Sequence, residues 1–161
     1  VQDKLVATVL TPKGLNRKCV GRSAKALLKM VGVDVPDNIR CITFEGEKEH
    51  PLIATELMMP ILGVVRARDF KDAVEKAVWL EHGNRHSAHI HSKNVDHITE
   101  YAKAIDTAIL VKNGPSYAAL GFGGEGYCTF TIASRTGEGL TAAHTFTKSR
   151  RCVMVESLCI R

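Results

Sequence analysis

The 161-residue chain contains no apolar run close to the roughly 20 residues that a membrane-spanning helix requires. We therefore expect no membrane partner. Apolar residues make up 45% and charged residues 24% of the chain, a balance that predicts one folded domain with a hydrophobic core. The first residue is Val1 rather than Met, and we expect the chain to be a piece of a longer product.

Aromatic residues are scarce, with one Trp, three Tyr and five Phe, and the excess of positive charge is small, at +5. Proteins that bind nucleic acid concentrate cations on one face and offer aromatic rings for stacking. Here the cations are scattered, and the densest cluster is only Lys148, Arg150 and Arg151. The composition therefore predicts no nucleic-acid partner.

Neither a disulfide framework nor a metal site is expected. The five cysteines are odd in number and form no C-x-x-C pair, which favours a reducing compartment. Four histidines fall within ten residues, but no Cys or acidic residue stands at a metal-ligand spacing beside them. The residues concerned are Cys19, Cys41, Cys128, Cys152 and Cys159, and His82, His86, His89 and His91.

Strand and helix patterns alternate along the middle of the chain. The expected strands are 39–44, 61–67, 86–92 and 108–111, and the expected helices begin after Ser23, Asp69 and Asn94. Such alternation predicts βαβ units, and hence an α/β fold with a mainly parallel sheet and flanking helices. Two further β-like runs, 127–133 and 151–156, predict a β-rich C-terminal segment.

Helical spacing also predicts which side chains are buried. In the helix that runs to Met30, the apolar positions are Ala24, Leu27, Leu28 and Val31. In the helix that ends at Gly83, the apolar positions are Phe70, Ala73, Val74, Ala77 and Val78, and the positions expected to face water are Lys71, Asp72, Glu75 and Lys76.

The string GFGGEG at 121–126 fits the G-x-G-x-x-G template of dinucleotide-binding loops. That template requires a helix to start at its last glycine, because the helix N-terminus holds the pyrophosphate. Here Tyr127 begins a β-like run, and no acidic residue ends a second strand about 20 positions on. The glycines are therefore expected to serve a sharp turn or a close backbone approach rather than a nucleotide.

Glu56 stands just before the buried strand 61–67, in the segment HPLIATELMMP. A carboxylate near the end of a sheet is well suited to bind sugar hydroxyls. The same pattern fits an acid on the surface of a helix, and the spacing alone leaves both interpretations open.

Longer stretches of the chain resemble a known family. TELMMPIL is similar to the Glu-x-Phe-x-Pro segment of the aldehyde dehydrogenase superfamily, and AVWLEHGNRHSAHIHSKN and ILVKNGPS resemble the helix and strands that follow it. One branch of that superfamily, the CoA-acylating aldehyde dehydrogenases of ethanolamine and propanediol utilisation, has a C-terminal signature that resembles GFGGEGYCTFTIASRTGEGLTAAHTFTKSRRC. The resemblance covers essentially the whole chain.

The resemblance implies the reaction of that branch, in which a short-chain aldehyde, CoA and NAD give acyl-CoA and NADH through a Cys thioester. It implies that Glu56 hydrogen-bonds the nicotinamide ribose, with Met58 or Met59 in place of the superfamily Phe. Phe122, Thr131 and Ile132 lie in a segment that resembles the wall of the substrate funnel. The last strand, around Val153, resembles the strand that joins a neighbouring subunit, which implies a homo-oligomer.

The family's nucleophilic Cys, its oxyanion-hole Asn and its main nucleotide-binding domain lie upstream of the part matched here. None of the five cysteines stands in the nucleophile's context, and the earliest, Cys19, follows LNRK. We therefore expect residues 1–145 to be a partial catalytic domain without a catalytic residue of its own, and 146–161 to be the oligomerisation strand. The chain alone is expected to be inactive.

The resemblance further implies a cytoplasmic location, which includes the interior of a bacterial microcompartment. The alternative to part of an enzyme is a free-standing binding or assembly module without catalysis. Such a module would act through an exposed strand edge.

Overall fold

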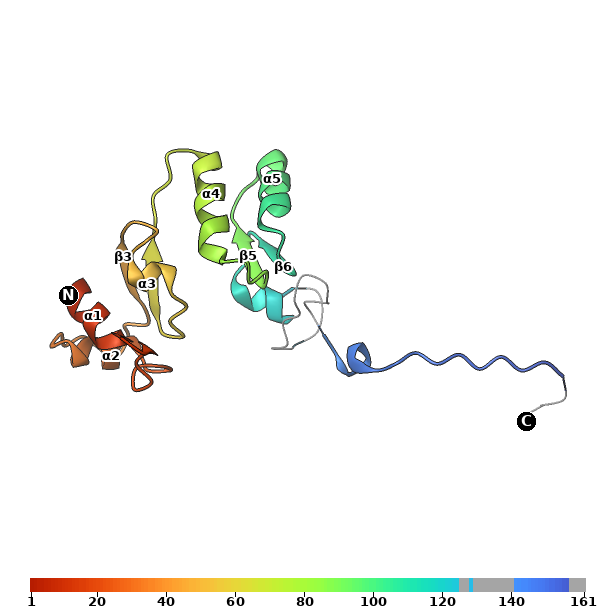
Figure 1. Cartoon of the computed structure of the whole chain (residues 1–161), viewed down its shortest axis with the longest axis horizontal. Helices are drawn as coiled ribbons and strands as arrows, with labels where there is room; N and C mark the ends of the chain where they lie inside the picture. Colours follow the sequence, from red (N-terminus) through yellow and green to blue (C-terminus); the bar gives the residue numbers. More distant parts are fainter. Residues whose placement is uncertain (125–127, 129–140, 157–161) are drawn as a thin grey trace. The chain divides into compact units, whose positions relative to one another are not determined.

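The computed structural model describes residues 1–124, 128 and 141–156. The chain divides into two compact units, Val1–His82 and Gly83–Arg161 (Figure 1). Each unit contains one pair of short parallel strands with helices beside it. This arrangement confirms the predicted α/β class. No helix in the described part of the chain is long and apolar enough to cross a bilayer.

The first unit begins with α1 (Gln2–Val9), the hairpin strands β1 (Leu10–Thr11) and β2 (Gly14–Leu15), and α2 (Ala24–Met30). α2 starts as predicted, because Ser23 Oγ accepts a hydrogen bond from the backbone N–H of Ala26. All four predicted apolar positions of α2 are buried, namely Ala24, Leu27, Leu28 and Val31. The sequence pattern does not predict α1, although Leu5 and Val9, one turn apart, are its buried residues.

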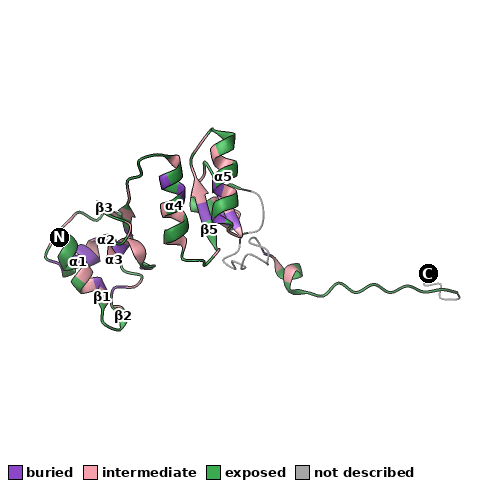
Figure 2. Cartoon of the chain, turned by 45° about the horizontal axis from the view of Figure 1, so that its top comes forward, coloured by how far each residue is buried: buried purple, intermediate pink, exposed green. Residues whose placement is uncertain are grey.

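β3 (Ile42–Glu45) and β4 (Ile61–Val64) pair in parallel, with Ile42 opposite Ile61. The one-turn helix α3 (Pro51–Ala54) lies between them in sequence and packs on β4. Gly63 permits this packing, because a Cβ at that position would collide with Ile53 Cγ1. The core of the unit joins α1, α2, α3 and β4 through Leu5, Val9, Cys19, Leu27, Leu52, Leu57 and Ile61 (Figure 2).

α4 (Phe70–Glu81) ends the first unit and is capped by Asp69, as predicted. Its burial corrects the prediction, because Asp72 is buried whereas Ala73 and Val78 are exposed. Of the predicted apolar stripe only Val74 is fully buried. The helical period predicts α4 correctly, but it places Asp72 on the side that faces water. Asp72 is buried because hydrogen bonds, rather than apolar contacts, hold its carboxylate.

The second unit follows the predicted order of strand, helix and strand, with β5 (Ser87–Ile90), α5 (Val95–Ile105) and β6 (Ile109–Lys112). β5 and β6 are parallel, with Ser87 opposite Ile109. Asn94 Oδ1 caps α5 by accepting from the backbone N–H groups of Asp96 and His97. The described part of the unit also contains the 3₁₀ helices η1 (Ser116–Leu120) and η2 (Ala143–Phe146).

The predicted β-rich end falls partly outside the described residues, because most of 127–133 is not described. Residues 147–156 run without helix or strand, and those from Val153 to Val155 are exposed. Within the described chain, therefore, the run 151–156 has no strand partner.

Candidate functional site

Glu56 lies in the bend that leads from α3 to the amino-terminal end of β4. Since α3 ends at Ala54, the interpretation of Glu56 as a helix-surface acid is wrong. The carboxylate is exposed, and none of the described residues forms a hydrogen bond or ion pair with it. Leu57, the next residue, is 6% exposed and belongs to the core, so the bend is anchored while the carboxylate stays accessible.

A cavity of about 280 Å³ opens beside this bend. Thr55 and Leu57, the two neighbours of Glu56, line it. Its remaining walls are mainly apolar and come from α3, Met58, Met59, β4 and Leu80 of α4. Cavities with apolar walls and few polar groups are typical sites for cofactors and small ligands.

Met58 fixes the far side of the bend. Its backbone has φ +54, a left-handed conformation that costs a non-glycine residue about 1–2 kcal/mol. The backbone N–H of Gly21 donates to the Met58 carbonyl at 3.2 Å, and the side chain of Met58 is 65% exposed. The Gly21 hydrogen bond therefore holds the backbone at Met58, while the Met58 side chain next to Glu56 stays largely exposed.

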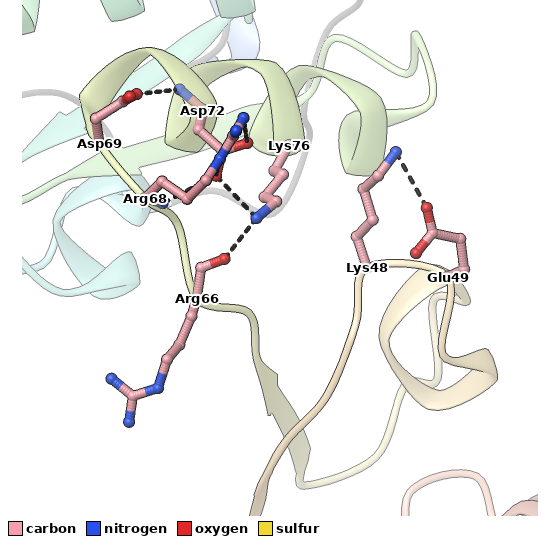
Figure 3. Close-up of polar contacts among 7 residues, drawn as sticks. All are labelled: Lys48, Glu49, Arg66, Arg68, Asp69, Asp72 and Lys76. Carbon is pink, nitrogen blue, oxygen red and sulfur yellow. Dashed lines mark hydrogen bonds and ion pairs between the residues drawn. The ribbon is translucent and has the colours of Figure 1, made fainter.

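Asp72 organises the other end of β4, where the chain turns into α4 (Figure 3). Its carboxylate accepts from the backbone N–H of Arg68 at 2.9 Å and from Lys76 Nζ at 3.0 Å. Lys76 Nζ also donates to the carbonyl oxygen of Arg66 at 2.6 Å. The Arg68 backbone N–H, then the side chains of Lys76 and Arg68, hold the pKa of the Asp72 carboxyl well below its usual range.

In the second unit, polar side chains meet at the carboxyl ends of β5 and β6. The Asn113 amide donates to the Ser92 carbonyl and accepts from the Ser92 N–H, both at 2.8 Å. Ser116 Oγ lies 3.1 Å from His89 Nε2. The four histidines do not gather with acidic or Cys residues into a metal-ligand group in the described part of the chain.

The start of the glycine-rich string has the backbone role that the sequence predicts. Gly121 ends η1 with φ +78 and Gly123 has φ +74, both in the left-handed region that glycine favours. A Cβ at Gly124 would lie 2.8 Å from the Ala118 carbonyl oxygen, so this glycine permits a close backbone approach. Residues 121–124 thus follow a 3₁₀ helix, and Gly124 lies against Ala118 of that helix.

Phe122 is 74% exposed and meets Tyr117 edge to face, with ring centroids 6.5 Å apart. The pair forms an accessible aromatic surface at the end of η1. Thr131 and Ile132, predicted to line the same substrate funnel, lie outside the described residues. Their predicted role therefore stays a prediction.

The structure describes four of the five cysteines, namely Cys19, Cys41, Cys128 and Cys152. Cys19 is 0% exposed and its Sγ lies 3.6 Å from the Thr8 carbonyl oxygen, so it is a core residue. Cys41, Cys128 and Cys152 are exposed and unbonded to one another. Cys41 Sγ lies 3.7 Å from the Ile42 carbonyl oxygen, a group that cannot take the thiol proton as a general base.

Similar proteins identify what these elements belong to. The chain is 48% identical over 143 residues to the acetylating acetaldehyde dehydrogenase EutE of Salmonella typhimurium, which covers 89% of this chain and 31% of the relative. A propionaldehyde dehydrogenase from the Clostridium phytofermentans fucose utilisation microcompartment is 81% identical, with a TM-score of 0.90 over 99% of this chain and 37% of that one. The chain belongs to the CoA-acylating aldehyde dehydrogenase family.

A third relative of the family is the propionaldehyde dehydrogenase of Rhodopseudomonas palustris, solved with bound propionyl-CoA. It is 53% identical, with a TM-score of 0.88 over 94% of this chain and 34% of that structure. No family model matches the chain. The chain spans about a third of the length of the relatives it matches, and it therefore carries only some of the elements of a complete family member.

Sequence reasoning misses two features of the site. The apolar cavity depends on Leu80 approaching α3 and β4, and no local pattern encodes that approach. The left-handed backbone conformation of Met58 cannot be predicted from the sequence either, because such positions are normally occupied by Gly or Asn. The string Glu-Leu-Met-Met-Pro does carry a signal, since a proline before a buried strand indicates a fixed bend.

Proposed function

We propose that this chain supplies the cofactor-contacting bend and part of the aldehyde-binding surface of a CoA-acylating, NAD-linked aldehyde dehydrogenase. The reaction would convert a short-chain aldehyde, CoA and NAD into acyl-CoA and NADH. The observation that carries the proposal is the match over 99% of the chain to a microcompartment propionaldehyde dehydrogenase, at 81% identity. The same relative supports a cytoplasmic location inside a microcompartment.

Glu56 would bind the nicotinamide ribose. An ionised carboxylate can accept hydrogen bonds from two vicinal hydroxyls at once, and Glu56 is exposed with no partner among the described residues. The apolar cavity beside Thr55 and Leu57 offers room for a planar ring next to that sugar. Bound NAD would supply the hydride acceptor, and the contribution of this chain would be to orient it.

Phe122, together with Thr131 and Ile132, would line the path of the aldehyde. The exposed Phe122–Tyr117 pair supports an apolar surface suited to a short alkyl chain. The thiolate that attacks the aldehyde would come from outside these 161 residues, because Cys19 is buried and none of the five cysteines stands in the sequence context of the family's nucleophile. The chain alone would therefore have no dehydrogenase activity.

The C-terminal run would mediate assembly. Val153, Met154 and Val155 are 57–84% exposed, an unusual exposure for three consecutive apolar residues. Added as a strand to a neighbouring subunit's sheet, their backbone would gain hydrogen bonds and their side chains would be covered. A variant with Met154→Pro would then lower the oligomeric state measured by light scattering, whereas Lys148→Ala would leave it unchanged.

The test of the proposed function is a chimera in which this chain replaces the corresponding segment of the Clostridium phytofermentans propionaldehyde dehydrogenase. We expect the chimera to form NADH only when propionaldehyde, CoA and NAD are all present, and we expect the isolated chain to form none. A correctly assembled chimera without activity would contradict the proposal. Activity of the isolated chain that is lost on Cys19→Ser would contradict the external nucleophile.

A further inference from the structure

We propose that His82 is a positioning residue whose imidazole holds the bend that carries Glu56. His82 Nε2 lies 2.9 Å from the carbonyl oxygen of Ala54, although the two residues are 28 positions apart in the chain. A carbonyl oxygen only accepts, so Nε2 carries the proton and donates. Ala54 is the last residue of α3 and stands two residues before Glu56. The functional part of this proposal rests on the role proposed above for Glu56.

The backbone of His82 supports this assignment. His82 ends α4 with φ +56 and ψ 17, a left-handed conformation that Gly and Asn adopt most readily. Its neighbour Gly83 is left-handed as well, with φ +76. A residue with a bulky side chain persists in such a conformation where surrounding contacts over-determine it. The bond to Ala54 is a contact of the imidazole that a glycine would lack.

A second contact links the end of α4 to the chain before α3. The rings of His82 and Trp79 have centroids 5.5 Å apart, and Lys48 Nζ lies 4.3 Å from the centroid of a Trp79 ring. Lys48 belongs to the turn that leads into α3. The last turn of α4 is therefore linked to the chain both before α3 and where α3 ends.

The position of the His82 bond distinguishes it from the other restraints on the bend. The buried Leu57 side chain and the Gly21–Met58 backbone bond act on residues after Glu56. His82 acts on a residue before it. Glu56 thus lies between two fixed points, and loss of the first would let the carboxylate move while the core packing of Leu57 remains.

Three substitutions separate the bond from the backbone conformation. His82→Gly suits the left-handed backbone and removes the donor. His82→Asn also tolerates this backbone, but its amide is too short to replace Nε2 at Ala54. His82→Gln has the length to place an amide N–H near the imidazole position and is the conservative rescue. His82→Asn is the matched control for His82→Gln, because both introduce a primary amide.

The first readout is amide hydrogen exchange in this chain. We expect the Ile53 and Ala54 amides, which donate to the His50 carbonyl at 2.8 and 2.9 Å, to exchange about fivefold faster in His82→Gly and His82→Asn, the factor that one net hydrogen bond is worth. His82→Gln should restore slow exchange, and amides in the middle of α4 should stay protected in all three. Unchanged exchange in His82→Gly, or equal exchange in the Gln and Asn variants, would overturn the proposal.

The second readout is the apparent KM for NAD in the chimera described above. We expect His82→Gly to raise it about fivefold, with the KM values for propionaldehyde and CoA unchanged, and His82→Gln to restore it. If Glu56→Gln raises the KM for NAD and His82→Gly does not, the positioning role is refuted. If neither variant changes it while exchange of the Ile53 and Ala54 amides accelerates, the role of Glu56 fails and the restraint by His82 stands.

Discussion

The side-chain amide of Asn113 forms two hydrogen bonds of 2.8 Å with the backbone of Ser92, and so joins the chain segments that leave β5 and β6. Asn113 also has φ +53, a left-handed conformation that Asn tolerates better than most residues. One residue therefore satisfies two backbone groups and makes the turn at the end of β6. This junction leads directly into η1 and the Phe122 surface.

Replacement of Asn113 should separate these two roles. Asn113→Gly keeps a residue suited to the left-handed turn and loses both hydrogen bonds, which should reduce the free energy of unfolding by about 1–2 kcal/mol. Asn113→Ala should cost about 1 kcal/mol more, because alanine is strained at positive φ. Urea unfolding of the three proteins measures both differences. Equal stability of the Gly and Ala variants would contradict the role of the turn.

Asp72 should make the stability of the first unit sensitive to acid. The pKa of its carboxyl is lowered in the folded chain by the Arg68 backbone N–H, Lys76 and the Arg68 side chain. A carboxyl with a lowered folded pKa stabilises the fold above its unfolded pKa of about 3.9, and this stabilisation is lost as the pH falls below that value. Unfolding free energies measured from pH 6 to pH 2 should therefore fall steeply below about pH 4.

Asp72→Asn should remove that part of the pH dependence, so its stability should change less between pH 4 and pH 2. Asp34→Asn provides the control, since Asp34 is an exposed acid. If Asp72→Asn and the unsubstituted chain lose stability in parallel as the pH falls, the hydrogen-bonded carboxylate is not the source of the acid sensitivity.

Gly63 and Ile53 should be coupled. Gly63→Ala places a Cβ that collides with Ile53 Cγ1, and we expect a loss of about 1–3 kcal/mol in the free energy of unfolding. In the background of Ile53→Ala the same substitution should cost much less, because the colliding atoms are gone. A double-mutant cycle by urea unfolding gives the coupling. An identical cost in both backgrounds would show that α3 does not pack on β4 at this point.

How much the sequence predicts depends on whether the deciding interaction is local. The Ser23 cap and the four buried apolar positions of α2 are predicted correctly, because capping and helical spacing are set within a few residues. Asp72 is predicted wrongly, since its burial depends on the path of the chain from Arg66 to Arg68. The 28-residue link from His82 to Ala54 leaves no local pattern at all. The pattern names Glu56 as a candidate and the resemblance assigns it to the nicotinamide ribose, but the cavity beside it requires the folded chain.

The role of Glu56 is most directly tested by the nucleotide dependence of the chimera. Glu56→Gln removes the charge that strengthens hydrogen bonds to the ribose, so the apparent KM for NAD should rise about tenfold, with the KM for propionaldehyde unchanged. Glu47→Gln, an exposed acid in the loop before α3, should leave both values unchanged. An apparent KM for NAD that is the same in the Glu56→Gln and unsubstituted chimeras would contradict the assignment of this bend to the cofactor.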